Sequence, residues 1–518
     1  MGPADRAQGG ARDMTHYRAF PLIFLLATMD GCAVGPDYTR PDMVKNAAYR
    51  PGFMSKSIHG TPGAGPSGAR QTLLEGADVS GQWWRAFGSP KLDALIARAC
   101  AGSPNLAALK ARLKSAYEQT DAQGSSLLPT IAASFNPTKN KTSRAYSPVP
   151  GNNRYLYGLQ TAQLAITYQP DIWGGNRRAV ESQAAQAQAQ RFELIAATNT
   201  LINNVLVAVI TQARLRAQLA ATGQITAVQQ RIYDVMEKQF ALGDVSKAQL
   251  LAQRAALSQA QSLMPDLRLQ LAKMHDLIAA LIGTTPDEVL PEFNLEDFQL
   301  PANLPVTLPS GLLDQRPDIR QAEARLHAAT ADLGVAIADR LPNVQLSAFP
   351  GQAVNAMNQF FAPGMGNWSI AAMVTQPIFQ GGALLHTQRA RRAEVTAAVA
   401  TYRDTVLSAI QDVADCLHAL QQDADALSIS AANEKAAVES FSISRSQADI
   451  GDISPVLLQA SVQIELEARL NLISARADRY LDSVALFQAV GGGWWHRQDA
   501  DMPDPGTDWR AAFQQRDY

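Results

Sequence analysis

The segment Pro-Asp-Ile-Trp-Gly-Gly at residues 170–175 returns in the same pattern as Pro-Ile-Phe-Gln-Gly-Gly at residues 377–382. Downstream, a Gly-Asp pair follows the last glycine of each segment by 68 residues, at Gly243-Asp244, and by 69 residues, at Gly451-Asp452. Upstream, two prolines lie 25 residues apart in both copies, at 104 and 129 and again at 317 and 342. These matching lengths indicate an internal duplication in which both halves share one structure.

Composition excludes several classes of protein. With 518 residues, of which 47% are hydrophobic and 18% charged, the chain can bury a large core. The formal net charge of −2 argues against nucleic acid, which would require a basic face. The seven histidines are scattered, and neither a Gly-x-Ser-x-Gly motif nor a phosphate-binding glycine loop occurs, so we expect no enzyme. Cys32, Cys100 and Cys416 show no paired spacing, so neither a disulfide framework nor a metal site is expected.

The N-terminus is typical of a secretory signal. Arg12 and Arg18 precede an apolar run over residues 19–27, which is too short to cross a bilayer permanently. The run ends in Met29-Asp-Gly-Cys32, which resembles a bacterial lipobox except that Asp30 stands where a small residue is usual. We therefore expect a covalent lipid on Cys32 as the only attached group, with a plain secretory signal as the alternative.

Long helices dominate both copies. Residues 176–242 and 383–450 lack proline, and each would form one helix of about 100 Å at 1.5 Å per residue. Two shorter helices accompany each long one, over residues 104–127 and 246–282 in the first copy and 317–340 and 454–490 in the second. Apolar residues spaced alternately four and three positions apart predict coiled-coil packing of the helices in both copies. One such series is Leu466, Leu470, Ile473, Ala477, Tyr480, Val484 and Phe487.

Between the first short helix and the long helix, each copy carries sequence of period two. Ile131, Ala133 and Phe135 alternate with small or polar residues, as do the odd and even positions of 159–168, 344–348 and 368–375. This predicts two strands per copy, of the length that a membrane barrel needs, joined in the first copy by a polar loop over residues 136–154. Four strands cannot close a barrel, and open edges in lipid are costly. Three chains would supply twelve strands.

This organisation resembles the TolC-like outer-membrane efflux proteins, most closely the lipoprotein branch of the NodT or OprM type. The resemblance covers nearly all of the chain from Cys32 to Trp494. The residues that carry it are Cys32-Ala-Val-Gly-Pro-Asp-Tyr38, Trp83-Trp84-Arg-Ala-Phe-Gly88, Phe240-Ala-Leu-Gly243, Leu313-Asp-Gln-Arg-Pro-Asp-Ile319, Gln376-Pro-Ile-Phe-Gln-Gly-Gly382 and Gly491-Gly-Gly-Trp494.

The resemblance implies a fold class and a set of partners. The fold is a mixed α/β membrane protein: a homotrimer with a twelve-stranded transmembrane β-barrel, four strands per chain, continued by a long α-helical periplasmic barrel. It implies an outer-membrane location, a periplasmic adaptor (membrane fusion) protein and an inner-membrane RND transporter, with a role in multidrug resistance. The implied function is a passive exit duct for drugs or other small molecules.

The resemblance also assigns site residues. It places barrel-to-helix turns at Pro170, Gly174, Gly175, Pro377, Gly381 and Gly382, and the periplasmic tip at Gly243-Asp244 and Gly451-Asp452. The acidic ring that the family often has just past the tip is replaced here by Gln249, Leu457 and Ala460. We expect Asp244 and Asp452 to form a charged rim instead, with Val456 and Leu457 as an apolar constriction. The alternative is that these aspartates only cap helices.

The landmarks divide the chain into six segments. They are a signal peptide at 1–31, a lipidated equatorial segment at 32–103, a first repeat at 104–285, a proline-rich equatorial linker at 286–316, a second repeat at 317–493 and a tail at 494–518.

Two other functions remain open at this stage. One is an outer-membrane tunnel of a type I protein secretion system. The other is a periplasmic adaptor or structural protein built of helical hairpins, which would explain the coiled-coil patterns but not the four alternating strands.

Overall fold

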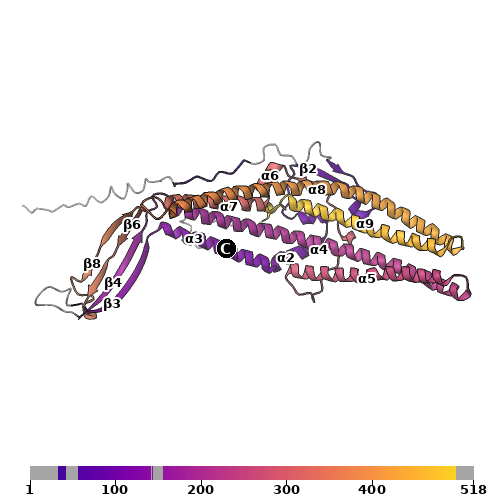
Figure 1. Ribbon diagram of the computed structural model, residues 1–518, viewed down its shortest axis with the longest axis horizontal. Coiled ribbons are helices and arrows are strands. Elements are labelled where there is room, and N and C mark those ends of the chain that lie inside the picture. The colour runs from indigo at the N-terminus through magenta and orange to yellow at the C-terminus, as the bar shows by residue number, and fades with distance from the viewer. Residues whose placement is uncertain (1–32, 43–48, 50–55, 142, 144–155, 498–518) are drawn as a thin grey trace, which may run out of the picture. The chain divides into compact units, whose positions relative to one another are not determined.

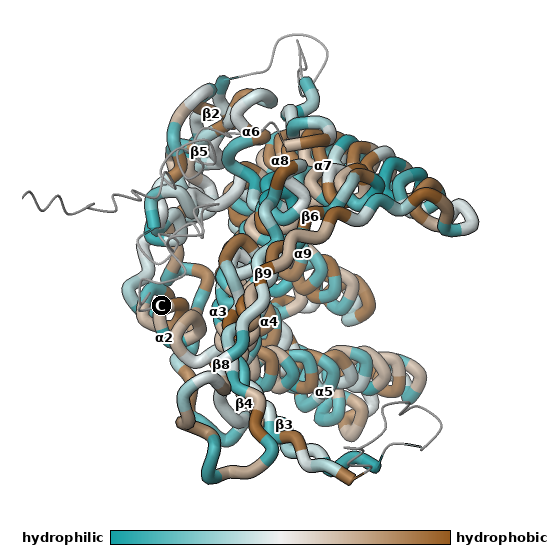
Figure 2. Tube along the Cα trace, turned by 90° about the vertical axis from the view of Figure 1, so that its left-hand side faces the viewer, coloured by the Kyte–Doolittle hydropathy of each residue, from teal (hydrophilic) through white to brown (hydrophobic). Residues whose placement is uncertain are grey.

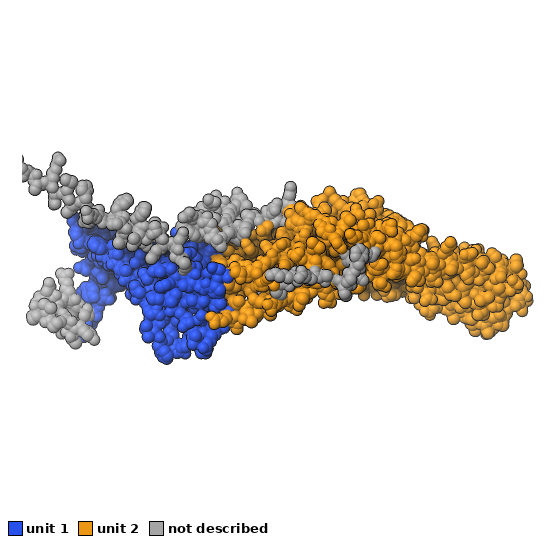
Figure 3. Space-filling view, turned by 90° about the horizontal axis from the view of Figure 1, so that it is seen from above, with its two compact units in different colours: residues 1–37, 123–180, 331–391 blue, residues 38–122, 181–330, 392–518 orange. Residues whose placement is uncertain are grey.

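The computed structural model describes residues 33–42, 49, 56–141, 143 and 156–497. The predicted signal peptide, Cys32 and residues 498–518 of the tail lie outside the described residues. The chain divides into two compact units, one of residues 1–37, 123–180 and 331–391 and the other of the remaining residues (Figure 3). The first unit holds the large β-sheet, and most of the helical residues belong to the second.

The helices confirm the predicted duplication (Figure 1). The long helices are α4 (Gly175–Leu242) and α8 (Ala383–Asp449). Each leads into a shorter helix, α5 (Lys247–Ile282) or α9 (Pro455–Ala489). Before the strands of each copy lie α3 (Pro104–Gly124) and α7 (Pro317–Ala338), which are preceded by α2 (Pro90–Gly102) and α6 (Pro309–Gln315). Thus every helix predicted from the sequence is present to within a few residues, and α5 continues through Pro265.

Amphipathic stripes hold the helices of the second unit together. Hydrophobic and hydrophilic residues follow one another in bands along α4 and α5 in Figure 2. On α8 the buried stripe has a four-three spacing, over Tyr402, Val406, Ala409, Val413, Leu417, Leu420, Ala424 and Leu427. A stripe of this period places one apolar row against neighbouring helices and leaves the other face exposed. One window of α4 is apolar enough to cross a membrane, but 61% of it is buried inside the protein, which identifies it as a core helix.

A small sheet that the sequence did not predict also lies in the second unit. β2 (Gln71–Glu75) pairs antiparallel with β1 (Ser57–Ile58) and parallel with β5 (Asn303–Val306). Beside this sheet, Trp83 of the short 3-10 helix Trp83–Phe87 stacks on Phe487 with ring centroids 5.0 Å apart. The closing glycine segment of the chain contacts α4 in this unit, because Asn199 of α4 donates a hydrogen bond to the carbonyl oxygen of Gly491 at 2.9 Å.

The large sheet is antiparallel throughout. β4 (Leu156–Tyr168) pairs with β3 (Thr130–Lys141) on one side and with β6 (Asn343–Ala348) and β7 (Gly351–Val354) on the other. On the far side from β4, β9 (Ile370–Thr375) pairs with β6, and β8 (Gly366–Asn367) pairs with β7. The sheet is therefore four strands wide, as predicted.

Two details of the predicted strands are wrong. The second-copy strands are interrupted, because Pro350 has no N–H to offer the ladder and separates β6 from β7. Phe349 and Ser369 still exchange backbone hydrogen bonds, of 2.8 and 3.3 Å, across this break. The polar loop was also predicted to begin at residue 136, whereas β3 continues through Pro137 to Lys141. Proline is tolerated there because β3 is an edge strand, which among the described strands pairs only with β4.

Candidate functional site

The large sheet has one apolar face and one polar face. In-register partners run across all four strands: Ile131 faces Ile166, which faces Ala348, which faces Ile370. The neighbouring row is Thr130, Thr167, Ser347 and Ala371. The apolar face comprises Ile131, Ala133, Phe135, Ala162, Leu164, Ile166, Tyr168, Val344, Leu346, Ala348, Ile370, Ala372 and Val374, and toward the far ends of β3 and β4 it also carries Pro137, Lys139, Lys141, Leu156, Gly158 and Gln160. The polar face comprises Thr130, Ala132, Ser134, Asn136, Thr138, Asn140, Tyr157, Leu159, Thr161, Gln163, Ala165, Thr167, Asn343, Gln345, Ser347, Ala371, Met373 and Thr375.

At the two edges of the sheet, the apolar face is exposed within the described part of the chain. Ile131 is 69% exposed and Ile370 is 77% exposed, on opposite edges of the sheet. Burying a large aliphatic side chain contributes about 1.5–3 kcal/mol, so such side chains exposed at both edges of this face indicate an apolar environment outside the chain. A lipid bilayer supplies such an environment.

Both edges of the sheet are open within the described residues. β3 pairs only with β4, and β9 pairs only with β6. In hydrocarbon each unpaired backbone group costs several kcal/mol, so an open edge there must be closed by another strand. The sheet of one chain therefore cannot form a closed barrel by itself.

The turn at the end of β4 is built around Asp171. Its carboxylate accepts hydrogen bonds from the backbone N–H groups of Asn176 and Arg177, at 3.0 and 2.9 Å, and so caps the first turn of α4. Gly174 has a φ of +75°, which favours glycine. Trp173 donates its indole N–H to the carbonyl oxygen of Pro342 at 2.8 Å, which joins this turn to the residue before β6.

The matching turn of the second copy is built differently. Gly381 and Gly382 have φ values of +61° and +86°, but position 378 holds Ile where the first copy has Asp171. Gln376 instead donates to the carbonyl oxygen of Arg340 at 3.1 Å. Phe379 is 87% exposed, so this turn adds to the apolar surface of the sheet.

The residues just after Cys32 are fixed to the first turn. The Val34 N–H donates to the carbonyl oxygen of Trp173 at 2.9 Å, and a Cβ at Gly174 would lie 2.6 Å from Ala33. Arg178 of α4, whose side chain is almost fully buried, pairs with Asp37 at 2.5 Å. The residues that follow Cys32 therefore lie beside the turn that joins the end of β4 to α4.

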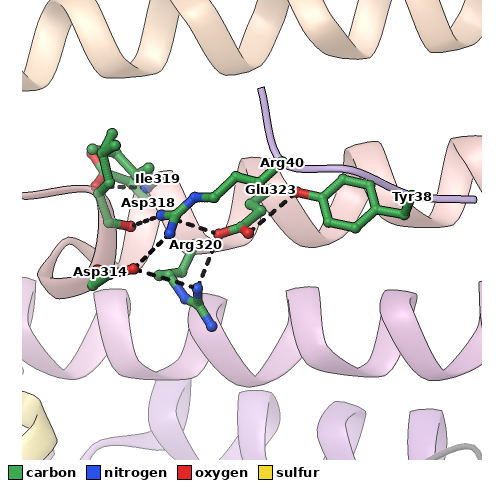
Figure 4. A network of polar contacts seen from close by, with 8 residues as sticks. Tyr38, Arg40, Asp314, Asp318, Ile319, Arg320 and Glu323 are labelled. Carbon is green, nitrogen blue, oxygen red and sulfur yellow. Dashed lines mark hydrogen bonds and ion pairs between the residues drawn. The ribbon is translucent and has the colours of Figure 1, made fainter. Parts of the chain in front are cut away.

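In the second unit, the next few residues join a polar network with α6 and α7 (Figure 4). Arg40 bonds to Asp314 at 2.7 Å and lies 3.5 Å from Glu323, which also accepts from the Tyr38 hydroxyl at 3.2 Å. Burial, with the charge and hydrogen bond of Glu323, raises the pKa of Tyr38 above its usual value, so its proton stays in place. Leu313 and Asp314, which open the Leu313–Ile319 segment, therefore have a structural role in holding Arg40.

The two helical tips have nearly the same geometry. Gly243 and Gly451 have φ values of +88° and +78°, and the N–H groups of Asp244 and Asp452 reach back to the carbonyl oxygens of Gln239 and Gln447, both at 2.9 Å. This is the Schellman ending of a helix, in which a left-handed glycine satisfies free carbonyls. Both tips lie in the second unit and are exposed.

The gate residues predicted beside these tips have local roles that the structure shows. Gln249 accepts from the N–H of Ser246 at 2.8 Å, while the Ser246 hydroxyl accepts from the Gln249 N–H at 3.2 Å, a capping box at the start of α5. At the start of α9 the Ser454 hydroxyl accepts from the N–H of Leu457 at 3.4 Å, a one-way cap. Val456 and Leu457 are more than half exposed. The charged rim and apolar constriction stay predictions.

A lipid-exposed sheet with open edges, joined to helical hairpins, defines the class of membrane channel proteins that assemble from several chains. A family model described as outer membrane efflux protein matches residues 95–284 and 308–492. The chain belongs to the outer membrane efflux protein family, which confirms the predicted resemblance. It is an outer-membrane component of an efflux pump that extends into the periplasm, and the family consists of channel proteins.

Curated relatives agree over most of their length. The pyoverdine export outer membrane protein OpmQ of Pseudomonas putida is 29% identical over 439 residues, which are 82% of this chain and 89% of that protein. The toluene efflux pump outer membrane protein TtgC, also of Pseudomonas putida, is 25% identical over 478 residues, covering 90% and 94%.

Solved structures confirm the predicted fold class. The outer-membrane channel OprN matches with a TM-score of 0.79 at 24% identity, covering 89% of this chain and all of that one. The outer membrane protein VceC of Vibrio cholerae matches with a TM-score of 0.74 at 25% identity, covering 80% and 100%.

Proposed function

We propose that three copies of this chain close their four-stranded sheets into a twelve-stranded barrel that serves as the passive exit duct of a tripartite pump for small molecules. The observation that carries the proposal is the pair of open edges, on β3 and β9, in a sheet whose exposed face is apolar. Edge-to-edge pairing between copies satisfies the backbone groups of both edges at once. A periplasmic adaptor and an inner-membrane RND transporter are the partners that complete such a pump.

Purified protein tests this assembly directly. We expect a trimer in detergent that dissociates on heating, and ion conductance across a planar bilayer. A detergent-free, monodisperse monomer would contradict the proposal, because it would leave the apolar face and both edges in water.

The cargo is tested separately from the assembly. Export of small molecules predicts that deletion of the gene sensitises cells to drugs or blocks siderophore export, in line with relatives named for pyoverdine and toluene. Loss of a secreted protein without these effects would favour the type I secretion alternative.

A covalent lipid on Cys32 is the second part of the proposal. It is supported by the contacts of Ala33, Val34 and Asp37 with Gly174, Trp173 and Arg178, which start the chain at the ends of the strands. Cys32→Ser should abolish incorporation of labelled palmitate and leave the trimer intact. Cys100→Ser and Cys416→Ser are matched controls that should keep the label, and a labelled Cys32→Ser protein would refute the assignment.

The third part concerns the tip. Asp244 and Asp452 each follow a left-handed glycine at an exposed helical tip, so a trimer would carry six carboxylates there. The double variant Asp244→Asn with Asp452→Asn should lower the cation selectivity of single channels. Asp266→Asn, on the exposed face of α5, is the control. Unchanged selectivity in the double variant would show that these aspartates only end helices.

A further inference from the structure

The polar face of the large sheet carries no fixed charge. From Thr130 to Asn140 on β3 and from Tyr157 to Thr167 on β4, every residue of this face is a hydroxyl, amide, aromatic or aliphatic side chain. The second copy continues the pattern across β6 and β9, where Gln345 faces Met373 and Ser347 faces Ala371. On the described strands, this face therefore has no Asp, Glu, Lys, Arg or His.

Charged residues occur at the ends of the strands instead. Lys139 and Lys141 are among the last residues of β3. Lys139 is in register with Gly158 and Lys141 with Leu156, so both lysines belong to the face opposite the polar one. At the other end, Asp171 is occupied in capping α4. In the described sheet, these charged side chains thus lie near the strand ends and not on the polar face between them.

Two residues in and before the described loop between β7 and β8 lie on the opposite, apolar side of the sheet. Phe360 of that loop packs edge-on against Phe135 at 6.2 Å between ring centroids, and Phe135 belongs to the apolar face. Val354, at the end of β7, is only 2% exposed. Its register with Gln160 places it on the same side as Phe135. The loop therefore folds over the apolar side of the sheet.

We infer that the barrel portion of the channel is an electrically neutral passage, which selects solutes by cross-section and hydrogen bonding and admits anionic, cationic and uncharged solutes alike. This inference rests on the proposed trimer, in which the apolar face meets lipid and the polar face lines the lumen. Charged rings are the usual means by which pores sort ions, and a wall of hydroxyls and amides offers hydrogen bonds to solutes of either sign. Any charge selection by the whole channel must then arise in the helical part.

The decisive experiment adds a charge to the neutral wall. Gln163 lies in the middle of β4, in register with Ser134 and Gly351. Gln163→Glu would place three carboxylates in one ring of the trimer. We expect the cation-over-anion permeability ratio, from reversal potentials in a KCl gradient, to rise at least about threefold near 0.1 M salt. The gain should disappear near 1 M salt, where the screening length is about 3 Å.

Controls and a second probe fix the interpretation. Lys139→Gln removes a charge from the opposite face and should leave selectivity unchanged. If Gln163→Glu does not give a heat-dissociable trimer, Ser134→Asp tests the same level of the barrel. Hexaamminecobalt(III) applied from the extracellular side should block the Gln163→Glu channel at a lower concentration than it blocks the wild-type channel.

Two results would overturn the inference. One is an unchanged permeability ratio in a folded Gln163→Glu trimer, which would mean that this face does not line the lumen. The other is a changed permeability ratio in Lys139→Gln, which would mean that the face opposite the polar one lines the lumen. A wild-type protein that conducts no ions would instead refute the proposed channel function, and this inference with it.

Discussion

Replacement of Asp423 by asparagine should remove a pH dependence that is built into the α8–α9 hairpin. Burial raises the pKa of Asp423 to about 8, helped by a hydrogen bond with Asp482 of α9. The Oδ2 atom of Asp423 is buried and receives no donor from the described residues. Asp478 adds to the effect, whereas the buried Arg479 opposes it. Two carboxylates can bond in this way only when one of them holds a proton.

The sign follows from the direction of the shift. In the unfolded chain Asp423 loses its proton near its ordinary pKa, so between about pH 4 and pH 8 the native state holds about one more proton. Its contribution to stability is complete at the acidic end and is lost as the pH rises through 8. The limiting slope is about 1.4 kcal/mol per pH unit. Because Asp423 is partly exposed, screening by solvent reduces the total to about 1 kcal/mol between pH 6 and pH 8.5.

Thermal unfolding of the purified protein at pH 6.0 and pH 8.5 measures this contribution. The wild type should lose more stability between these pH values than Asp423→Asn, whose amide donates to Asp482 at any pH. Asp404→Asn, an exposed position on the same helix, is the control and should keep the wild-type difference. If Asp423→Asn shows the wild-type difference, the pair does not share a proton in the native state.

Three further changes test the packing. Alanine at Gly243 or Gly451 should cost about 1 kcal/mol in thermal or urea unfolding, from backbone strain alone, because no atom lies within 4 Å of the added Cβ; a neutral result would mean that the turns relax. Pro265→Ala should raise stability by up to about 3 kcal/mol by restoring an interior hydrogen bond of α5, and a loss would show that the proline is needed there. Trp83→Ala should cost about 3–5 kcal/mol through its contact with Phe487, whereas a loss below about 1 kcal/mol would mean that the site collapses around the smaller residue.

The helices were predictable from local sequence because their ends are marked by residues with strong backbone preferences. Gly243 and Gly451 end the long helices, and Ser246 and Ser454 begin the next ones. The capping role of Gln249 was missed, although the spacing Ser-x-x-Gln is a readable signal. The alternation of the strands likewise predicted which side chains share a face, and the register of the strands in the structure agrees with it.

The small sheet could not be predicted from local pattern. β1 and β2 are two and five residues long, and β2 pairs with β5, so that Thr72 faces Asn303. Such short strands have no detectable period, and their pairing is fixed by contacts between residues that are remote in the chain. The same is true of Arg40 and Asp314, because neither residue alone signals the network that joins them.

The open edges of β3 and β9 have a genetic consequence. If each pore is sealed by strands from three chains, a single chain that cannot pair its edge spoils the whole assembly. When normal and edge-defective copies are made in equal amounts and mix at random, roughly one assembly in eight contains only normal chains. Edge-defective alleles should therefore act dominantly over the wild type, whereas alleles that prevent folding altogether should be recessive.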